Sequence, residues 1–319
     1  MNSIKIRRHE TSLLPECARV ILRPFIPGEP WRIKGIIART LALTDQQVSE
    51  ELELIRHQFE SRHLDIEPVL LSNFHRIEEH LESGKILSHE QRLLIGALFS
   101  GEYALESAAL FNPSIVPHPD QKGVPSGGLR FIMSLRATGE GHISSIEFRT
   151  GNISTDGSIT FDSISRFVSE PEIVPNPSYR KESFILKLKE MGFDNHHFTA
   201  AVLKPLKNHF TLSDLNQSIG TVRHDATGPA LELRETLECI QWLADSNYEL
   251  QFPETLAMSE RLIFPVSPNE TNGIEDARFV RFVDDDGTVK YYATYTAYNG
   301  HSILPQLIET EDFLHFRIL

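Results

Sequence analysis

The chain has 319 residues, of which 40% are hydrophobic and 24% charged, so it is long enough to bury a large core and has the composition of an ordinary globular protein. Its formal net charge of −13 argues against a general nucleic-acid-binding protein, which would carry a basic face. An anionic substrate is not excluded, because a local cluster of arginines and lysines can oppose the overall sign.

Cysteine content and the N-terminal sequence bear on the cellular compartment. The two cysteines, Cys17 and Cys239, are far apart in the sequence and provide no disulfide framework, which favours a reducing compartment. Basic residues near the N-terminus are not followed by the apolar segment of a signal peptide, and no apolar run approaches the length of a membrane span. We therefore predict a cytoplasmic protein without a membrane partner.

Residues 1–105 are predicted to form an extended segment followed by helices. Two prolines within Val20–Pro27 favour an extended conformation there. Thr44 followed by Gln47 indicates a capping box, and Ser88 is predicted to cap a later helix. Apolar residues recur at helical spacing after both caps, so we expect a helical hairpin or a small bundle.

Residues 106–179 and 180–245 show two different patterns. The first segment has four short apolar runs separated by turn residues, which predicts an antiparallel sheet about the size of one propeller blade. The second segment returns to helical spacing and is predicted to be a helical insertion. This insertion could cover an active site, form an oligomer interface or brace the propeller.

The segment Asn272–Gly300 predicts a β-hairpin within residues 246–319. Two apolar runs, Arg278–Val283 and Thr288–Thr296, flank an acidic turn that ends in glycine. Such a turn between two β-runs is a strong hairpin signal.

A pair of carboxylates stands where the first run of this hairpin begins. Glu275 and Asp276 follow Gly273, which permits a sharp turn that would aim the next side chains inward. Arg278 lies two residues after Asp276, so both side chains would share one face of an extended strand. A general acid in sugar chemistry needs a carboxyl group that keeps its proton. From these residues alone, a solvated ion pair on a surface turn is an equally good explanation.

Two groups of motifs resemble a known family. G-I-E-D-A-R, which ends at Arg278, and Y-T-A-Y-N-G, which ends at Gly300, resemble the signature of glycoside hydrolase family 130. F-N-P-S at Phe111–Ser114 and L-R-A at Leu135–Ala137 resemble two further elements of that family. Ala277 stands where the family usually has proline, a departure that leaves the acid and the arginine in place.

The resemblance implies a fold that is mainly β with helical additions. We expect an incomplete five-bladed β-propeller of about two blades, built from residues 106–179 and 246–319. We also expect the chain to be the N-terminal part of a longer protein, with the family's phosphate-binding residues beyond Leu319. An open propeller would expose strand edges and apolar faces, so the chain alone is expected to be poorly soluble or inactive.

The resemblance also implies roles for three residues at the reaction centre. Asp276 would be the catalytic general acid, and Asn112 and Arg136 would bind the sugar beside the cleaved bond. Without the resemblance, Asn112 before a proline indicates an Asx-type turn, and Arg136 indicates a solvated strand end.

Further polar residues complete the expected site. Glu275, Arg278 and Tyr298 are the other substrate-binding candidates. Glu140, between two glycines, is either a base that activates water or an exposed loop charge, and Glu270 is expected to be a solvated loop charge. Metal-binding spacings and nucleotide-binding loops are absent from the sequence, so we predict no metal and no cofactor.

The expected function is inverting phosphorolysis of β-mannosides, with a mannose-containing oligosaccharide and inorganic phosphate as partners and mannose 1-phosphate as product. An inverting β-mannosidase and a non-catalytic carbohydrate-binding propeller are the alternatives, and a homo-oligomer stays open. In a hydrolase, the base should lie about 6.5 to 9.5 Å from the acid to leave room for water. The carbohydrate hypothesis predicts that Asp276 faces a sugar-sized hollow lined by Asn112 and Arg136.

Overall fold

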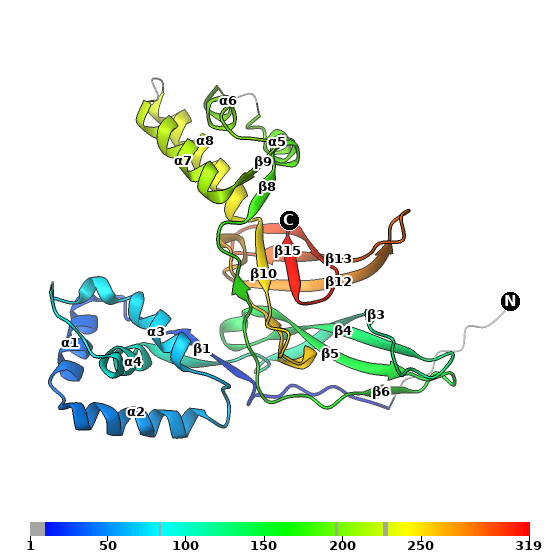
Figure 1. Ribbon diagram of the computed structural model, residues 1–319, viewed down its shortest axis with the longest axis horizontal. Coiled ribbons are helices and arrows are strands. Elements are labelled where there is room, and N and C mark those ends of the chain that lie inside the picture. Colours follow the sequence, from blue (N-terminus) through cyan, green and yellow to red (C-terminus); the bar gives the residue numbers. More distant parts are fainter. Residues whose placement is uncertain (1–9, 83, 195–196, 226–228) are drawn as a thin grey trace.

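A computed structural model describes residues 10–82, 84–194, 197–225 and 229–319. Figure 1 shows a first group of helices at the lower left, strands in the centre and at the right, and a second group of helices above the strands. These described residues form eight α-helices and 15 strands. The protein therefore combines two helical groups with an extensive sheet.

The first helical group confirms both predicted caps. Gln47 N–H donates to Thr44 Oγ1 over 3.3 Å, and Gln91 N–H donates to Ser88 Oγ over 3.1 Å. Each cap residue also donates its own N–H to the glutamine side chain, which completes a capping box. The helices of this group are α1 (Pro30–Leu41), α2 (Asp45–Phe59), α3 (Glu67–His75) and α4 (His89–Leu98).

A glycine lets α3 and α4 pack closely. A Cβ atom on Gly96 would lie 1.9 Å from the main-chain oxygen of Leu70, so a larger residue does not fit without moving a helix. After α4, the chain forms β2 (Ser100–Ala104), which pairs antiparallel with β1 (Val20–Pro24). The helical pattern thus ends before residue 100, and β1 forms the first part of the extended segment predicted for Val20–Pro27.

Most other strands belong to one sheet of 11 strands. Its hydrogen-bonded order is β3-β4-β5-β12-β13-β14-β15-β10-β7, and β6 and β11 also pair with β5. Neighbouring strands are antiparallel, except that β5 and β12 are parallel and meet at the single pair Ser144 and Gly273. The strands are β3 (Ala109–Pro117), β4 (Leu129–Thr138), β5 (Ser144–Ile153), β6 (Ile159–Phe161), β7 (Glu172–Ile173), β10 (Tyr248–Gln251), β11 (Leu262–Ile263), β12 (Gly273–Val283), β13 (Val289–Tyr298), β14 (Ile303–Thr310) and β15 (His315–Ile318).

The predicted mainly β propeller fold is wrong. The 11 strands form one continuous hydrogen-bonded sheet that closes into neither a barrel nor a propeller. The pair between Ser144 and Gly273 joins the strands of residues 106–179 to those of residues 246–319, where separate blades were expected. The apolar runs and turns that predicted two blades are local features, and they do not specify how one group of strands pairs with the next.

Aromatic side chains fill the core where these two groups of strands meet. The Phe148 ring centroid on β5 lies 6.1 Å from that of Phe279 on β12. It also lies 5.8 Å from Phe313 and 6.0 Å from Phe316, and all four side chains are buried. This shared core holds β12 in a fixed position relative to β3, β4 and β5.

The predicted hairpin is formed by β12 and β13. Asp284 N–H donates to Thr288 O over 2.8 Å, and Gly287 N–H donates to Asp284 O over 2.9 Å. The strands are longer than predicted, because pairing continues from the turn back to Gly273 and Tyr298.

The second helical group is inserted between two neighbouring strands. β7 and β10 pair at Leu250 and Ile173, and the insertion leaves the sheet after the first and returns at the second. Its elements are β8 (Ser178–Arg180), α5 (Lys181–Glu190), α6 (His197–Leu203), β9 (His209–Thr211), α7 (Leu212–Asp225) and α8 (Ala230–Asp245). They enclose a core of their own, in which Leu188, Leu215 and Ile240 are fully buried.

In the described part of the chain, no helix has the length and apolarity needed to cross a bilayer.

Four buried charges tie the segment before β1 to the sheet. Arg19 lies 2.8 Å from Glu147, and Arg149 lies 2.7 Å from Glu106 and 3.0 Å from Glu147, with all four side chains at most 3% exposed. Burial and the nearby charge of Glu147 raise the pKa of Glu106 to about 7. Burial opposes ionisation of Glu147 as well, but the charges of Arg19 and Arg149 outweigh it and lower the pKa of that carboxyl.

Candidate functional site

Two β-bulges lie close to each other, one on β3 and the other on β12. On β3, Phe111 pairs with Arg136 and Ser114 with Ser134, so β3 has one extra residue between these pairs. On β12, Glu275 pairs with Thr296 and Arg278 with Thr294, which again leaves one extra residue. A bulge of this kind bends its strand and redirects the side chains within it.

Each bulge contains a residue with a positive φ angle, in the left-handed region of the Ramachandran plot. The φ angle of Asn112 is 53° and that of Asp276 is 56°. Asn and Asp adopt this conformation more readily than other residues with a side chain, so the residue types fit the two positions. The two side chains meet, and Asn112 Nδ2 donates to Asp276 Oδ1 over 2.5 Å.

Arg136 joins both carboxylates. Its Nη2 lies 2.5 Å from Glu275 Oε1, and its Nη1 lies 3.4 Å from Asp276 Oδ1. Its Nε donates to Ser144 Oγ over 2.9 Å, and the guanidinium carbon lies 5.0 Å from the Phe111 ring centroid. The guanidinium is thereby held on several sides, so its orientation is well defined.

Exposure differs among the charged groups of this cluster. The side chain of Arg136 is 18% exposed, that of Glu275 is 25% exposed and that of Asp276 is 43% exposed. Asp276 is therefore the group that a ligand from solvent can reach most easily.

The structure brings together four of the predicted site residues, namely Asn112, Arg136, Glu275 and Asp276. Asn112 donates to a side chain 164 residues away, where an Asx turn would have kept its contact local. Arg136 is bound by two carboxylates, which differs from a solvated strand end.

Arg278 and Tyr298 lie close to the cluster but make other contacts. Arg278 Nη1 donates to the main-chain oxygens of Asn112 and Pro113, over 3.2 and 2.6 Å. The bulge separates Arg278 from the regular strand geometry in which it would share a face with Asp276. Tyr298 pairs with Gly273, and its hydroxyl donates to Gly300 O over 3.2 Å.

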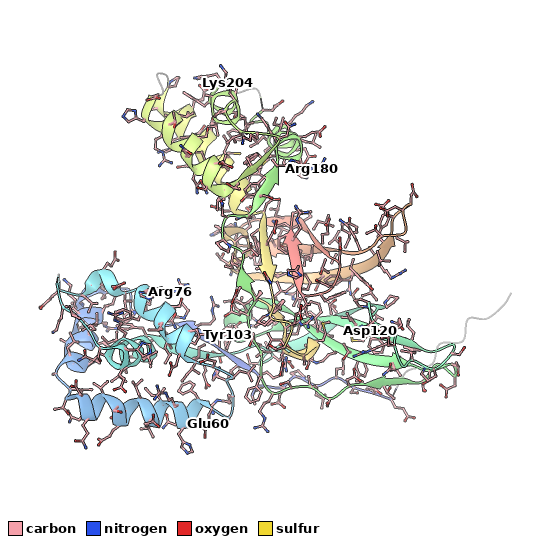
Figure 2. All side chains as sticks on the ribbon, in the orientation of Figure 1. Glu60, Arg76, Tyr103, Asp120, Arg180 and Lys204 are labelled. Carbon is pink, nitrogen blue, oxygen red and sulfur yellow. The ribbon has the colours of Figure 1, made fainter. Side chains whose placement is uncertain are left out.

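Glu140 is anchored on a different strand. Its Oε1 accepts a hydrogen bond from Ala104 N–H of β2 over 3.3 Å. Tyr103, labelled in Figure 2 where the first helical group meets the sheet, donates its hydroxyl to Glu140 O over 2.8 Å. The contact that positions this carboxylate is therefore with β2, and Asp276 is bound by Asn112 and Arg136 instead.

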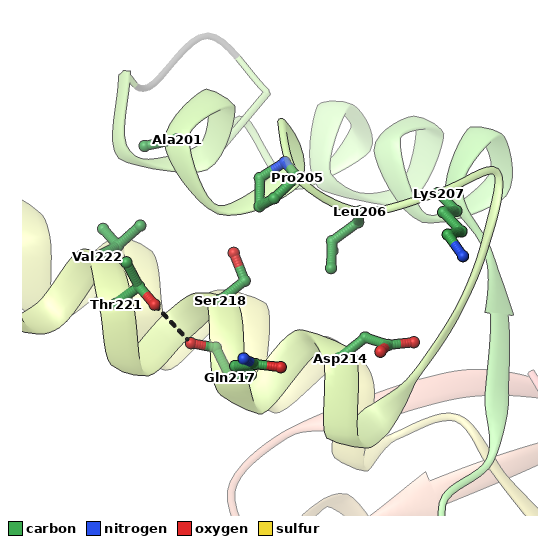
Figure 3. Close-up of a pocket in the computed structure, with 9 residues that line it drawn as sticks. All are labelled: Ala201, Pro205, Leu206, Lys207, Asp214, Gln217, Ser218, Thr221 and Val222. Carbon is green, nitrogen blue, oxygen red and sulfur yellow. Dashed lines mark hydrogen bonds between the residues drawn. The ribbon is translucent and has the colours of Figure 1, made fainter.

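Five hollows in the described surface are lined by residues other than the Asp276 cluster. Their volumes are about 300 to 610 Å³. Figure 3 shows one of about 340 Å³ between α7 and the segment with Ala201 and Pro205, where Thr221 Oγ1 donates to Gln217 O over 3.1 Å. None of the five is the sugar-sized hollow expected around Asp276.

The chain matches no family model, no curated protein and no solved structure. The motifs and the geometry of the Asp276 cluster are therefore the evidence that bears on function.

A buried carboxylate lies where a solvated one was expected. Glu270 is fully buried and accepts hydrogen bonds from the hydroxyl of Tyr248 over 2.9 Å and from that of Tyr295 over 2.5 Å. The main-chain N–H groups of Val266 and Ser267 donate to the same carboxylate over 3.0 and 2.9 Å. No local pattern reveals this group, because the tyrosines come from β10 and β13.

Metal ligands do not gather at the Asp276 cluster or elsewhere in the described residues, since no three His, Cys, Asp or Glu side chains are arranged to hold an ion.

Proposed function

We propose that the Asn112, Arg136, Glu275 and Asp276 cluster binds a β-mannoside and that Asp276 protonates the leaving oxygen in an inverting phosphorolysis. One observation carries the proposal: a partly exposed carboxyl in a left-handed turn is held by an amide and a guanidinium from a distant strand pair. The motifs that resemble glycoside hydrolase family 130 contribute the residues of this cluster.

The two oxygens of Asp276 have different surroundings. Oδ1 accepts from Asn112 Nδ2 and from Arg136 Nη1, and these are the contacts of the carboxyl with the described residues. In our proposal, Oδ1 stays bound to these donors, and the proton is carried by Oδ2. A fixed Oδ1 orients Oδ2 toward the ligand, which is how a general acid is positioned for proton transfer.

The proposed step transfers a mannosyl group from the glycosidic oxygen to phosphate. An oxygen of phosphate attacks C1 of the mannosyl group from the face opposite the leaving oxygen, so the configuration at C1 is inverted. The bond between C1 and the glycosidic oxygen breaks, and that oxygen keeps the electron pair. It takes the proton from Asp276 Oδ2, directly or through a sugar hydroxyl. The products are mannose 1-phosphate and the acceptor sugar, and Asp276 regains a proton from solvent.

The remaining residues have supporting roles in this proposal. Asn112 and Arg136 bind hydroxyl groups of the mannosyl unit with the donors that the carboxylates do not use. Glu275, which binds Arg136 Nη2, keeps the guanidinium in place beside Asp276. We place the reaction in the cytoplasm, where the sugar phosphate would stay inside the cell.

The test uses the chain with mannobiose isomers, in the presence and absence of inorganic phosphate. Mannose 1-phosphate that forms only with phosphate supports phosphorolysis, whereas free mannose formed without phosphate selects the hydrolase. Binding of the disaccharide without either product selects the non-catalytic alternative. A chain that neither binds nor converts any of the mannobiose isomers contradicts the carbohydrate hypothesis.

A pair of matched variants assigns the acid. Asp276→Asn should lower turnover roughly a hundredfold or more, because general acid catalysis contributes about 10² to 10⁴. Asp285→Asn makes the same chemical change in the turn of the same hairpin and should leave turnover unchanged. Equal activity of both variants contradicts the role of Asp276.

A further inference from the structure

The two bulges are held together by main-chain and side-chain contacts that do not involve Asp276. Arg278 of β12 donates to the oxygens of Asn112 and Pro113, which lie in the bulge of β3. In the opposite direction, Ser114 of β3 accepts from Phe279 N–H of β12 over 3.0 Å. One residue from each strand therefore binds the main chain of the other.

These contacts satisfy main-chain groups that a bulge leaves without a partner. The extra residue of a bulge interrupts the ladder, so main-chain groups beside it lack a partner on the neighbouring strand. The pairing of β3 with β4 is interrupted between Phe111 and Ser114, and the carbonyls of Asn112 and Pro113 lie in that interval. Arg278 supplies donors for both carbonyls.

We propose that Arg278 and Ser114 are positioning residues that lock the two bulges against each other and so set the contact between Asn112 and Asp276. This inference rests on the proposed function for its catalytic consequence, although the geometric part concerns the bulges alone. Arg278 fixes the backbone of Asn112 itself, and Ser114 fixes the backbone of β12 three residues after Asp276. Loss of either contact lets the Asn112 amide move away from Asp276 Oδ1.

A different role for Arg278 predicts a different result. If Arg278 bound substrate, its removal would raise the KM for the sugar, because binding would be weaker. The contact between Asn112 and Asp276 would not change. A positioning role predicts the reverse, because misplacement of a proton donor by about 1 Å costs up to roughly a hundredfold in rate. The two roles therefore differ in which kinetic constant changes and in whether the Asn112 amide moves.

The primary readout is the side-chain amide resonance of Asn112 in a ¹H–¹⁵N NMR spectrum. Asp276→Asn, which removes the carboxylate acceptor, defines the position of that resonance when the contact is altered. Arg278→Met and Ser114→Ala should both shift the resonance toward that position. Ser114→Thr keeps a hydroxyl acceptor in a β-strand and should restore the resonance to its original position.

The control lies on the same strand. Arg281→Met removes an arginine three residues further along β12, on the opposite face, and should leave the Asn112 resonance and the turnover unchanged. With mannobiose and phosphate, Arg278→Met and Ser114→Ala should lower kcat roughly tenfold to a hundredfold, with KM within about twofold of the unaltered chain. Ser114→Thr should recover most of kcat.

The outcomes separate the two proposals. An Asn112 resonance that stays in place in both Arg278→Met and Ser114→Ala overturns the positioning role, whatever the activity. A resonance that shifts as expected, in a chain that turns over no mannoside, supports the positioning role and contradicts the proposed reaction. A raised KM with an unmoved resonance shows that Arg278 binds substrate instead.

Discussion

Asn112 and Asp276 are 164 residues apart in the sequence, yet both adopt left-handed backbone conformations in facing bulges and join their side chains over 2.5 Å. Neither bulge alone would produce this contact. Each bulge interrupts the regular alternation of side chains along its strand and redirects a polar side chain. The shared core of the sheet brings the two strands together. The contact is therefore a property of the tertiary structure, and substitutions at either residue test it.

Substitution of Asn112 should separate the effect of backbone conformation from the effect of the lost amide. Asn112→Ala and Asn112→Gly both remove the hydrogen bond to Asp276, but only alanine is strained at a φ of 53°. We expect the glycine variant to be more stable by about 1 kcal/mol. Urea unfolding of both variants measures the difference.

A strand residue with ordinary backbone geometry provides the control for this comparison. At Asn152 on β5, which has no positive φ, alanine should be more stable than glycine, so the order of the two variants reverses. The same order at both positions would contradict the argument from backbone strain.

Arg136→Lys should destabilise the fold even though it preserves the charge. Lysine cannot reproduce the flat guanidinium that reaches Ser144, Glu275 and Asp276 at the same time. Since a hydrogen bond to a charged group contributes about 1.5–3 kcal/mol, the free energy of unfolding should fall by about that amount. Arg130→Lys, on the same strand and the same face, is the matched control and should change the free energy of unfolding by less than about 0.5 kcal/mol.

The features that could be predicted from the sequence are those set by neighbouring residues. The capping boxes at Thr44 and Ser88 and the turn between β12 and β13 depend on side chains a few positions apart, and the structure confirms them. The joining of two groups of strands into one sheet depends instead on pairs between distant residues: Gly273 with Ser144, Leu262 with Glu147, and Leu250 with Ile173. Local patterns do not contain that information, which is why the propeller was predicted in error.

The candidate site shows the same division between local and distant information. Its residue types were visible in the motifs around Asn112, Arg136 and Asp276, and the structure places them together. The left-handed conformations were not predicted, because both residues lie in bulges, and a bulge is defined by the pairing with another strand. Glu270 and Glu106 were missed as buried groups, since the residues that bind them come from distant parts of the chain.

Stability should depend on pH through Glu106. Its pKa is raised from an ordinary 4.5 to about 7, so the folded state holds the proton more tightly than the unfolded state does. The resulting stabilisation is present below about pH 4.5 and is lost as the pH rises through about 7. Glu106→Gln cannot titrate at this position, so the stability of the original chain relative to this variant should fall by about 1–3 kcal/mol between pH 5 and 8.

Urea unfolding at pH 5, 6, 7 and 8 measures this difference, and subtraction removes the titration of groups shared by both proteins. Glu254→Gln changes an exposed carboxylate and should show no such trend. A constant difference between the original chain and Glu106→Gln would contradict a raised pKa of Glu106.

Close packing of α3 on α4 should make Gly96 intolerant of any side chain. A Cβ at this position would lie 1.9 Å from Leu70 O, so Gly96→Ala forces the two helices apart and should cost about 1–3 kcal/mol or more in the free energy of unfolding. Gly220, in the middle of α7, has no atom within 4 Å of its added Cβ. Gly220→Ala should therefore stabilise the chain by about 0.5–1 kcal/mol, because alanine favours a helix more than glycine does. Thermal unfolding of the two variants compares them, and a stabilising Gly96→Ala would show that α3 and α4 do not pack this closely.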